Sequence, residues 1–182
     1  MRVPAHTPLA RAQRGVSLII TMVMLVIIGL TAAAAMRSAI SSEKVINNMR
    51  SEALAQQYAE AALRYCEQQM ALPSVSRVAK LQDDQIATID YGAATKWETT
   101  TSWVGGTPAR VIVPNEQFKN TDSSFSPSVA PQCMAEKQKL ADGTSVAVVV
   151  TARGFSPDYA ADADGKTTAG SVVWLQSTSA FN

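Results

Sequence analysis

The chain has 182 residues, with 16 Lys and Arg against 15 Asp and Glu and a formal net charge of +1. Acidic and basic residues are interspersed, so no basic field points to a nucleic-acid partner. The only histidine is His6, close to the N-terminus. The rest of the chain therefore cannot form a Ser-His-Asp triad or a His-containing zinc site. We expect a protein that is not an enzyme.

An apolar run from residue 16 to residue 36 follows a short polar leader. The run is long enough to cross a membrane, since a hydrocarbon core about 30 Å thick needs roughly 20 helical residues. Its only polar side chains are Ser17, Thr21 and Thr31, whose hydroxyls a helix can satisfy internally. The leader, residues 1–15, carries three arginines and no acidic residue. These features predict a single membrane-spanning helix near the N-terminus.

We interpret the border between the polar leader and the apolar run as a processing site. At this border Arg14-Gly15 directly precede Val16. A conventional signal peptide is cut after its apolar stretch, whereas a cut here would leave the apolar helix on the mature protein. The residues from Gln13 to Leu18 resemble the leader junction of type IV pilins and pseudopilins. In those families a prepilin peptidase cuts after the glycine and methylates the new N-terminus. The resemblance therefore implies Gly15 as the last leader residue and Val16 as the first mature residue.

Further segments resemble the PilX-type minor pilins. They are residues 42–50 and 59–64 after the apolar run, and residues 151–155 and 172–178 near the C-terminus. The resemblance implies a single-pass protein of the bacterial inner membrane, with a cytoplasmic N-terminus and a periplasmic globular part. From there it would enter the extracellular pilus fibre. The implied partners are other pilins and minor pilins, bound through the N-terminal helix, the prepilin peptidase and the inner-membrane assembly machinery.

Ile20, the fifth residue of the mature chain, departs from the family pattern. Major pilins carry a glutamate there, which in the family is thought to meet the N-terminus of a neighbouring subunit inside the membrane. A carboxylate in a membrane is costly unless it is paired, so its absence removes one attraction between subunits. Some minor pilins, especially those at filament tips, also lack it. The departure favours an accessory subunit over a bulk filament subunit.

The helix is expected to continue beyond the membrane to about residue 71. Proline is absent between Pro8 and Pro73, and apolar residues recur at close to helical spacing. We predict that the half nearest Pro73 packs on the protein's own sheet and that residues 37–50 pack against other subunits. The predicted organisation is a cleaved leader (1–15), a transmembrane half-helix (16–36), an amphipathic half-helix (37–72) and a globular β-sheet domain (73–182).

After Pro73 the pattern changes to short strand-like runs separated by turn residues. The hairpin signal Asp142-Gly143 separates two of them. A sheet with one apolar face must bury that face, and the long helix is the only candidate. The predicted fold class is α+β and type IV pilin-like, with the long N-terminal helix packed on an antiparallel sheet of about four or five strands. The expected strand-like runs are residues 95–104, 110–113, 132–140, 146–155 and 172–181.

The chain has two cysteines, Cys66 on the predicted helix and Cys133 near the start of a predicted strand. The predicted topology places both outside the cytoplasm, where disulfides persist. Two cysteines in that compartment, with none left over, are expected to pair. Two free thiols buried as small apolar residues are the alternative.

Three aspartates, Asp158, Asp162 and Asp164, precede Gly165 in the connection between the last two predicted strands. Oxygen ligands close together, with a glycine for a sharp turn, suit calcium, and type II secretion pseudopilins place calcium in a loop near their final strands. The spacing does not match an EF-hand, however, and an Asp-rich turn is common without a metal. A calcium site and a solvated loop both stay open, and the loop is favoured. No other cofactor is expected.

The function favoured by these observations is that of a minor pilin that takes part in the assembly or initiation of a type IV pilus. A place at the pilus tip and an adhesive role fall within this interpretation. A minor pseudopilin of type II secretion shares the junction and the missing glutamate, and is the first alternative. A secreted soluble binding protein is the second, since residues 32–35 offer an Ala-x-Ala cleavage site after an apolar core.

Overall fold

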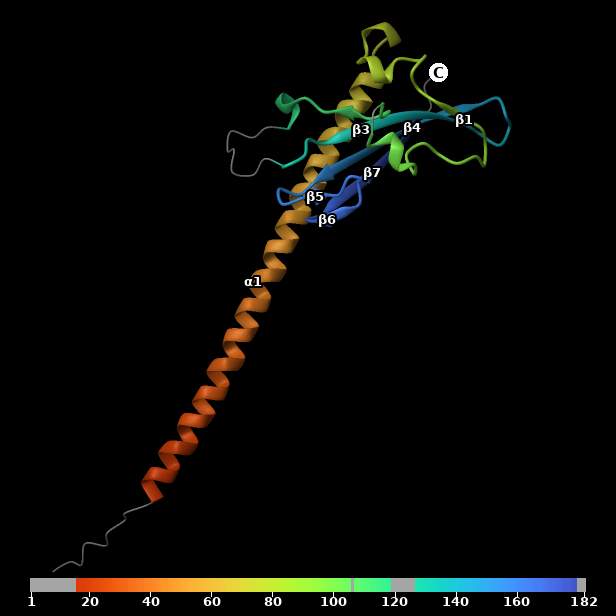
Figure 1. Ribbon diagram of the computed structural model, residues 1–182. Coiled ribbons are helices and arrows are strands. Elements are labelled where there is room, and N and C mark those ends of the chain that lie inside the picture. Colours follow the sequence, from red (N-terminus) through yellow and green to blue (C-terminus); the bar gives the residue numbers. More distant parts are fainter. Residues whose placement is uncertain (1–15, 106, 119–126, 180–182) are drawn as a thin grey trace, which may run out of the picture. The chain divides into compact units, whose positions relative to one another are not determined.

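The computed structural model describes residues 16–105, 107–118 and 127–179. The chain divides into two units between Ile46 and Asn47. Helix α1 (Val16–Met70) has residues in both units (Figure 1). Its 55 residues confirm the predicted long helix. The helix ends three residues before Pro73, because a proline disfavours helical backbone in the residue that precedes it and has no N–H to donate.

The N-terminal unit consists, in its described part, of residues 16–46 of α1, and every one of these residues is exposed. The backbone N–H and C=O groups of a helix pair within the segment itself. The helix therefore satisfies its own polar backbone without any contact to a sheet. Its apolar side chains, in contrast, cannot be covered by contacts within the helix itself.

The C-terminal unit contains a sheet with the strand order β1-β3-β4-β7, and β2 also pairs with β3 (Figure 1). The β2–β3, β3–β4 and β4–β7 pairs are antiparallel, as predicted, whereas β1 runs parallel to β3. The sheet is therefore mixed, and the prediction of a purely antiparallel sheet is wrong for β1, whose two residues are too few to form a sequence pattern. The strands are β1 (Thr88–Ile89), β2 (Val111–Ile112), β3 (Gln132–Lys139), β4 (Val146–Phe155) and β7 (Val172–Ser179).

The turn between β3 and β4 confirms the hairpin signal. Gly143 adopts a φ of 71°, which a glycine reaches without steric cost. The Asp142 carboxylate accepts hydrogen bonds from the backbone N–H groups of Thr144 (3.1 Å) and Ser145 (2.9 Å). The hydrogen bonds from Ser145 and then Thr144 hold the pKa of Asp142 below its ordinary value.

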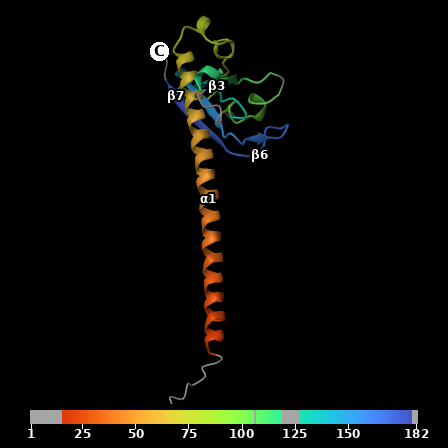
Figure 2. The ribbon, with the colours of Figure 1, turned by 90° about the vertical axis from the view of Figure 1, so that its left-hand side faces the viewer.

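One face of the sheet packs on the C-terminal part of α1 (Figure 2). Ala62, Cys66 and Met70 of α1 form one core with Val150 and other apolar residues of the sheet. This arrangement confirms that the helix buries the apolar face of the sheet. The remaining members of the core are Tyr65, Leu81, Ile86, Val111, Val113, Cys133, Ala135, Val148 and Ala152.

Gly154 lets the helix come close to β4. A Cβ atom at this position would overlap the carbonyl oxygen of Ala55 and the backbone nitrogen of Ala59. Both alanines are fully buried. The backbones of the helix and the strand therefore meet at a place where no side chain larger than hydrogen fits.

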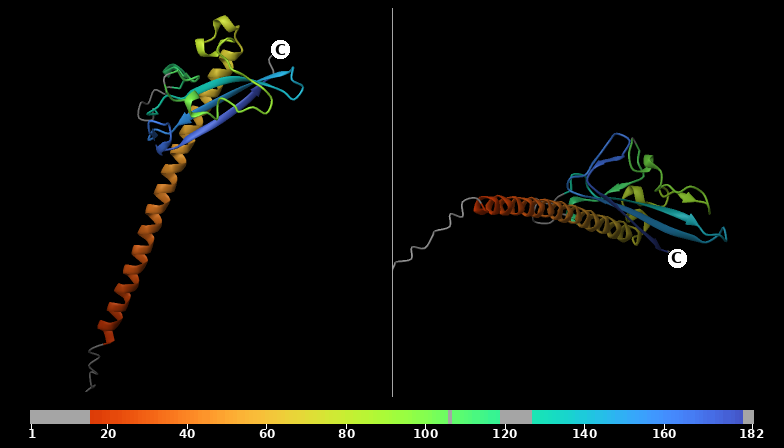
Figure 3. Two further views of the ribbon diagram at one scale, coloured as in Figure 1. Left: turned by 45° about the vertical axis from the view of Figure 1, so that its right-hand side comes forward. Right: turned by 90° about the horizontal axis from the view of Figure 1, so that it is seen from below.

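The opposite face of the sheet is covered by the connection between β1 and β2 and by a small hairpin, β5 (Ala160–Ala161) and β6 (Thr167–Ala169) (Figure 3). Residues 95–104, predicted as strand, form turns and the 3-10 helix η3 (Thr100–Ser102) instead, so that prediction is wrong. The indole of Trp103 donates to the carbonyl of Trp97 at 2.8 Å, which closes the segment on itself. The other 3-10 helices are η1 (Ser74–Ser76), η2 (Ala79–Leu81) and η4 (Asn115–Gln117).

Candidate functional site

The apolar run predicted to cross the membrane is an exposed stretch of α1. The helix is long and apolar enough to span a bilayer: its most apolar 18-residue window has a mean hydropathy of 2.6, and none of that window is buried. Leu25 and Leu30 are 69% and 68% exposed. Apolar side chains are stable in such numbers only when lipid or another protein covers them. This surface needs an environment that the chain itself does not supply.

The hydroxyl groups within this stretch are satisfied by the helix. The Thr21 hydroxyl donates to the carbonyl oxygen of Leu18 at 2.9 Å, and that of Thr31 donates to the carbonyls of Ile27 and Ile28 at 3.0 and 2.9 Å. This confirms for both threonines that the helix accommodates hydroxyls without an outside partner. Such bonds remove most of the cost of a hydroxyl in hydrocarbon.

The residues expected at the processing junction lie at the start of the helix. Val16 is the first residue of α1 and is 65% exposed, and Ile20 lies one turn later at 52% exposure. Gly15 lies outside the described residues. Cleavage after Gly15 and methylation of Val16 stay predictions. The side chain at position 20 is apolar like its neighbours, so this position offers no carboxylate to a neighbouring subunit.

Exposed apolar residues continue beyond the predicted membrane segment. Ile40, Val45, Ile46 and Met49 are between 53% and 65% exposed. They are followed by a change of environment, because Ala55 is the first buried residue of the helix. From there on, the residues that recur at helical spacing on this side of α1 are buried within the C-terminal unit. They are Tyr58, Ala59, Ala62, Tyr65, Cys66 and Met70. The half near Pro73 thus packs on the protein's own sheet, as predicted.

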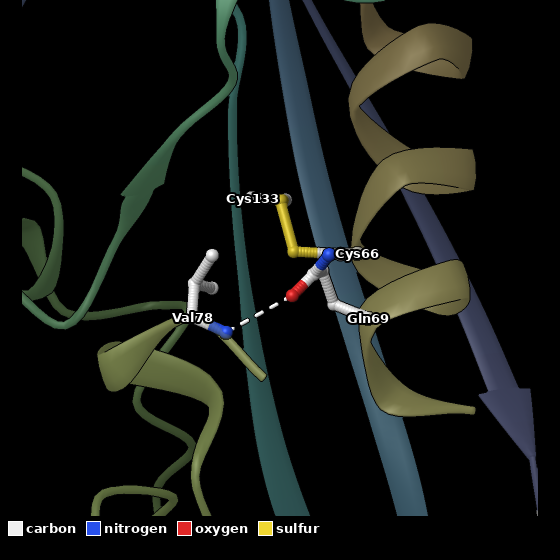
Figure 4. The surroundings of a disulfide bond; sticks show 4 residues. All are labelled: Cys66, Gln69, Val78 and Cys133. Carbon is white, nitrogen blue, oxygen red and sulfur yellow. Dashed lines mark hydrogen bonds between the residues drawn. A yellow bond between two sulfur atoms is a disulfide. The ribbon is translucent and has the colours of Figure 1, made fainter. Parts of the chain in front are cut away.

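The helix is bound covalently to the sheet near its C-terminal end. Cys66 of α1 and Cys133 of β3 form a disulfide, with Cα atoms 6.3 Å apart and both residues fully buried (Figure 4). One turn further along the helix, the Gln69 side chain accepts a hydrogen bond from the backbone N–H of Val78 at 2.9 Å (Figure 4). The disulfide and this hydrogen bond hold the sheet and the segment after Pro73 on one part of α1.

The segment after Pro73 is also held by a group of three charged residues, Arg77, Asp83 and Lys137, which we call the polar clamp. The Arg77 side chain donates to the carbonyl of Leu72 at 2.8 Å and pairs with Asp83 at 3.2 Å. Lys137 of β3 donates to the same Asp83 carboxylate at 2.8 Å. The hydrogen bond from Lys137, and then the charges of Lys137 and Arg77, lower the pKa of Asp83 below its ordinary value.

The three aspartates of the predicted loop do not form a metal cage. Asp162 uses its Oδ1 atom to accept from the backbone N–H groups of Asp164 (3.1 Å) and Lys166 (2.8 Å), which closes the turn between β5 and β6. Asp158 is exposed and precedes this hairpin. In the part of the chain that the structure describes, no group of three His, Cys, Asp or Glu residues could hold a metal ion. Asp162 therefore has a structural role in the turn, and a calcium ion at this loop stays a prediction.

A cluster that sequence reasoning missed lies on the sheet face opposite α1. Residues alternate between faces along a strand, so Ala152 points to the helix core and Arg153 to the other side. There Trp103 and Trp174 meet edge to face with ring centres 5.0 Å apart. Together with Trp97 they line a cavity of about 200 Å³ beside Arg153. The only signal for this cluster in the sequence was the content of tryptophan and arginine, which does not show which of these residues lie close together in the fold.

The comparison with protein families matches the N-terminal part of the chain. The family model described as PilX N-terminal matches residues 14–64. Residues 14–64 are thus similar to a PilX N-terminal domain. This domain supports a minor pilin related to the type IV pilus, and with the apolar helix it indicates a membrane-anchored pilin. No curated protein and no solved structure matches the chain significantly.

The PilX N-terminal domain ends within α1, two residues before Cys66. It therefore includes the exposed stretch and the first buried turns, whereas the disulfide, the sheet and the tryptophan cluster lie beyond it. The PilX family is a structural component of the pilus and is generally non-catalytic. Similarity of the closing strands to that family stays a resemblance on residues 151–155 and 172–178.

Proposed function

We propose that the chain is a minor pilin that takes part in the assembly or initiation of a type IV pilus. The observation that carries this proposal is the exposed apolar stretch of α1 in a chain with a PilX N-terminal domain. An apolar helix surface of this kind can lie in a bilayer or in a bundle of equivalent helices. A subunit that must move from a membrane into a fibre needs a surface that suits both.

The mechanism we infer is assembly by helix packing. Prepilin peptidase would cut after Gly15, and residues 16–36 would hold the mature subunit in the inner membrane until the assembly machinery extracts it. The exposed residues Ile40, Val45, Ile46 and Met49 extend the apolar surface past the membrane segment. They would contact neighbouring subunits in the fibre, because lipid cannot cover them there.

The proposal includes an accessory position, at the tip of the pilus, with an adhesive role for the globular unit. Ile20 supports the accessory position, since the subunit cannot offer the carboxylate that major pilins use between neighbours. A subunit with fewer attractions to its neighbours suits a place that few copies occupy. The globular unit would then face outward with its sheet face opposite α1 uncovered by other copies.

The test is the N-terminus of the mature protein. We expect Edman sequencing and intact mass to give a chain that starts at Val16 and carries one extra methyl group. The variant Gly15→Val should stay uncut and should not enter fibres sheared from the cells. A mature chain that starts near Met36 would contradict the proposal and support the secreted binding protein.

A second measurement separates the pilus from type II secretion. Deletion of the gene should reduce surface pili and leave the secretion of exoproteins unchanged. Normal pili with lost exoprotein secretion would instead support the minor pseudopilin. Complementation with the full chain should restore whichever phenotype is lost.

A further inference from the structure

Arg153 is a buried cation without an acidic partner. It is 8% exposed, and among the described residues its guanidinium donates only to the Gln132 side-chain oxygen, from Nε (3.0 Å) and Nη2 (2.7 Å). Its other contacts are aromatic: the guanidinium carbon lies 4.6 Å from the ring centre of Trp103 and 5.3 Å from that of Trp174. Cation–π contacts hold a guanidinium in place but leave its in-plane N–H groups unused.

Arg153 lines the cavity, and its Nη1 nitrogen is not fully buried. Among the described residues, the only fully buried side-chain nitrogen or oxygen atom without a hydrogen-bond partner is Nε of Arg110. Nη1 of Arg153 donates no hydrogen bond to the described protein, so it is not sealed from solvent. An arginine that is fixed by stacking and open at one edge is ready to donate to an anion.

Arg110 adds a second positive charge nearby. Its backbone N–H donates to the carbonyl of Ser102, the residue before Trp103. Burial lowers the pKa of Arg153 to about 10, the charge of Arg110 acts in the same direction, and Tyr159 opposes both. Neither arginine forms an ion pair in the described residues. Two guanidinium groups that feel each other's charge, neither of them in an ion pair within the described residues, favour an anion nearby.

The cavity beside Arg153, which we call the tryptophan pocket, has a size and a lining that limit its ligand. Trp103 is 2% exposed and forms its inner wall, whereas Trp174 is 41% exposed at its rim. About 200 Å³ suffices for one six-membered ring with substituents and is below the size of drug-like ligand sites. The pocket is lined by Trp97, Glu98, Thr100, Trp103, Arg153 and Trp174, with Gly165 beside them.

We propose that the tryptophan pocket binds a sugar acid, a monosaccharide unit that carries a carboxylate. The guanidinium edge of Arg153 matches the two oxygens of a carboxylate. Indole faces suit the apolar C–H faces of a pyranose ring, and Glu98 and Thr100 can accept hydrogen bonds from its hydroxyls. The negative charge of Glu98 repels a doubly charged phosphate more strongly than it repels a singly charged carboxylate, which favours the carboxylate of the two. A carboxylate on a hydroxylated ring satisfies all of these groups at once.

This inference deepens the adhesive part of the proposed function, since it names a class of ligand for the outward-facing unit. It rests on no step of processing or pilus assembly. Binding is measured on the purified full chain in detergent micelles, so failure to bind is distinguishable from failure to assemble. The cell-based tests of the N-terminus and of piliation would be unaffected by its outcome.

The experiment uses the fluorescence of the protein itself, because all three tryptophans of the chain line the pocket. We expect titration with D-glucuronate to change the tryptophan emission in a saturable way, with a Kd of millimolar order for a single sugar unit. D-glucose, which lacks the carboxylate, and acetate, which lacks the ring, should bind at least about tenfold more weakly. Equal responses to glucose or acetate would overturn the proposal, as would no saturable response to glucuronate.

Variants separate a binding role from a structural one. Arg153→Lys keeps the charge but loses the planar fork, and it should weaken glucuronate binding at least about tenfold. Trp174→Leu changes an exposed rim residue that the fold does not need buried, and it should also weaken binding. Arg64→Met removes an exposed arginine of α1 and should leave binding unchanged. Unchanged glucuronate affinity in a folded Trp174→Leu or Arg153→Lys protein would overturn the proposal.

Discussion

Residues 16–46 and residues 47–70 belong to one helix, yet the first stretch is wholly exposed and the second carries all the buried residues of α1. Both stretches satisfy their backbone hydrogen bonds in the same way. They differ in their apolar side chains, which other parts of the chain cover in the second stretch but not in the first. The comparison shows that a continuous helix can serve two purposes, since local backbone bonding does not depend on which surface is buried.

The exposed stretch and the buried stretch also differ in what would destabilise them. In the C-terminal unit, stability depends on the disulfide, on close packing at Gly154 and on the polar clamp at Asp83. Among residues 16–46 of the N-terminal unit none of these features is present, and the exposed apolar side chains there need a cover of lipid or another protein. Four changes test this contrast.

Removal of the disulfide should affect only the C-terminal unit. Cys66→Ala with Cys133→Ala opens a link between residues 67 apart in sequence, and chain-entropy arguments give a loss of about 4 kcal/mol in the free energy of unfolding. Denaturant unfolding followed by tryptophan emission measures this, because all tryptophans lie in that unit. Reductant should lower the unfolding midpoint of the wild type and leave that of the double variant unchanged. A wild-type midpoint that ignores reductant would contradict the prediction.

Gly154 in the C-terminal unit and Gly29 in the N-terminal unit allow the same substitution, glycine to alanine, to be compared in the two units. Gly154→Ala places a methyl group against the backbone of Ala55 and Ala59, and we expect a loss of about 3 kcal/mol in stability because the helix must move away from β4. Gly29→Ala meets nothing within 4 Å and should not destabilise the protein, since alanine favours a helix more than glycine does. Thermal unfolding in detergent compares the two. Similar midpoints for both variants would show that the helix and the strand are not in close contact.

The clamp at Asp83 should give a small and pH-dependent effect. Its pKa is lowered in the folded state, so the stabilisation is present above the ordinary carboxyl pKa of about 3.9 and is lost as the pH falls through the lower folded value. Asp83→Asn should cost less than about 1 kcal/mol at pH 7, because the carboxylate is largely exposed. The difference from the wild type should vanish at lower pH. Glu116→Gln, at an exposed site with no ion pair in the described residues, is the control and should show no such pH dependence.

The change with the smallest expected effect on stability is a double substitution in α1, which should instead have a large effect on assembly. Ile46→Ser with Met49→Ser changes two side chains that are each 65% exposed, so the free energy of unfolding should stay within about 0.5 kcal/mol of the wild type. Incorporation into sheared fibres should fall, because these residues would face neighbouring subunits. Gln57→Ser, on the wet face of the helix, should change neither quantity. Normal incorporation of the double variant would argue against an assembly surface at this place.

Much of the fold could be predicted because its signals are local. An apolar run of membrane length, a helical stripe without proline and the stop at Pro73 predicted α1 to within a few residues. The strand 146–155 was predicted with the bounds that β4 has, since it is rich in β-branched residues and follows a turn signal. The hairpin at Gly143 followed from a dipeptide that favours a positive φ.

The parts that were missed depend on contacts between distant residues. Thr95 to Val104 has strand-like alternation, but Trp103 is held by Arg153 and Trp174 from two strands, and this packing outweighs local propensity. The parallel pairing of β1 with β3 involves two residues on each side, too few to leave a pattern. The hydrogen bonds of Asp162 to the backbone of the β5–β6 turn could not be predicted either, and whether the three aspartates bind calcium stays a prediction.

From the sequence we could predict an apolar helix of membrane length that begins near Val16, its continuation far beyond the membrane, and a pair of cysteines that can join it to a sheet. These features depend on periodicity, length and composition, which are properties of neighbouring residues. The sequence did not show that burial starts at Ala55, that the helix meets the sheet at Gly154, or that three tryptophans gather around one arginine. Those depend on residues far apart in the chain, whose proximity is set by the packing of the helix on one face of the sheet and of the connections on the other.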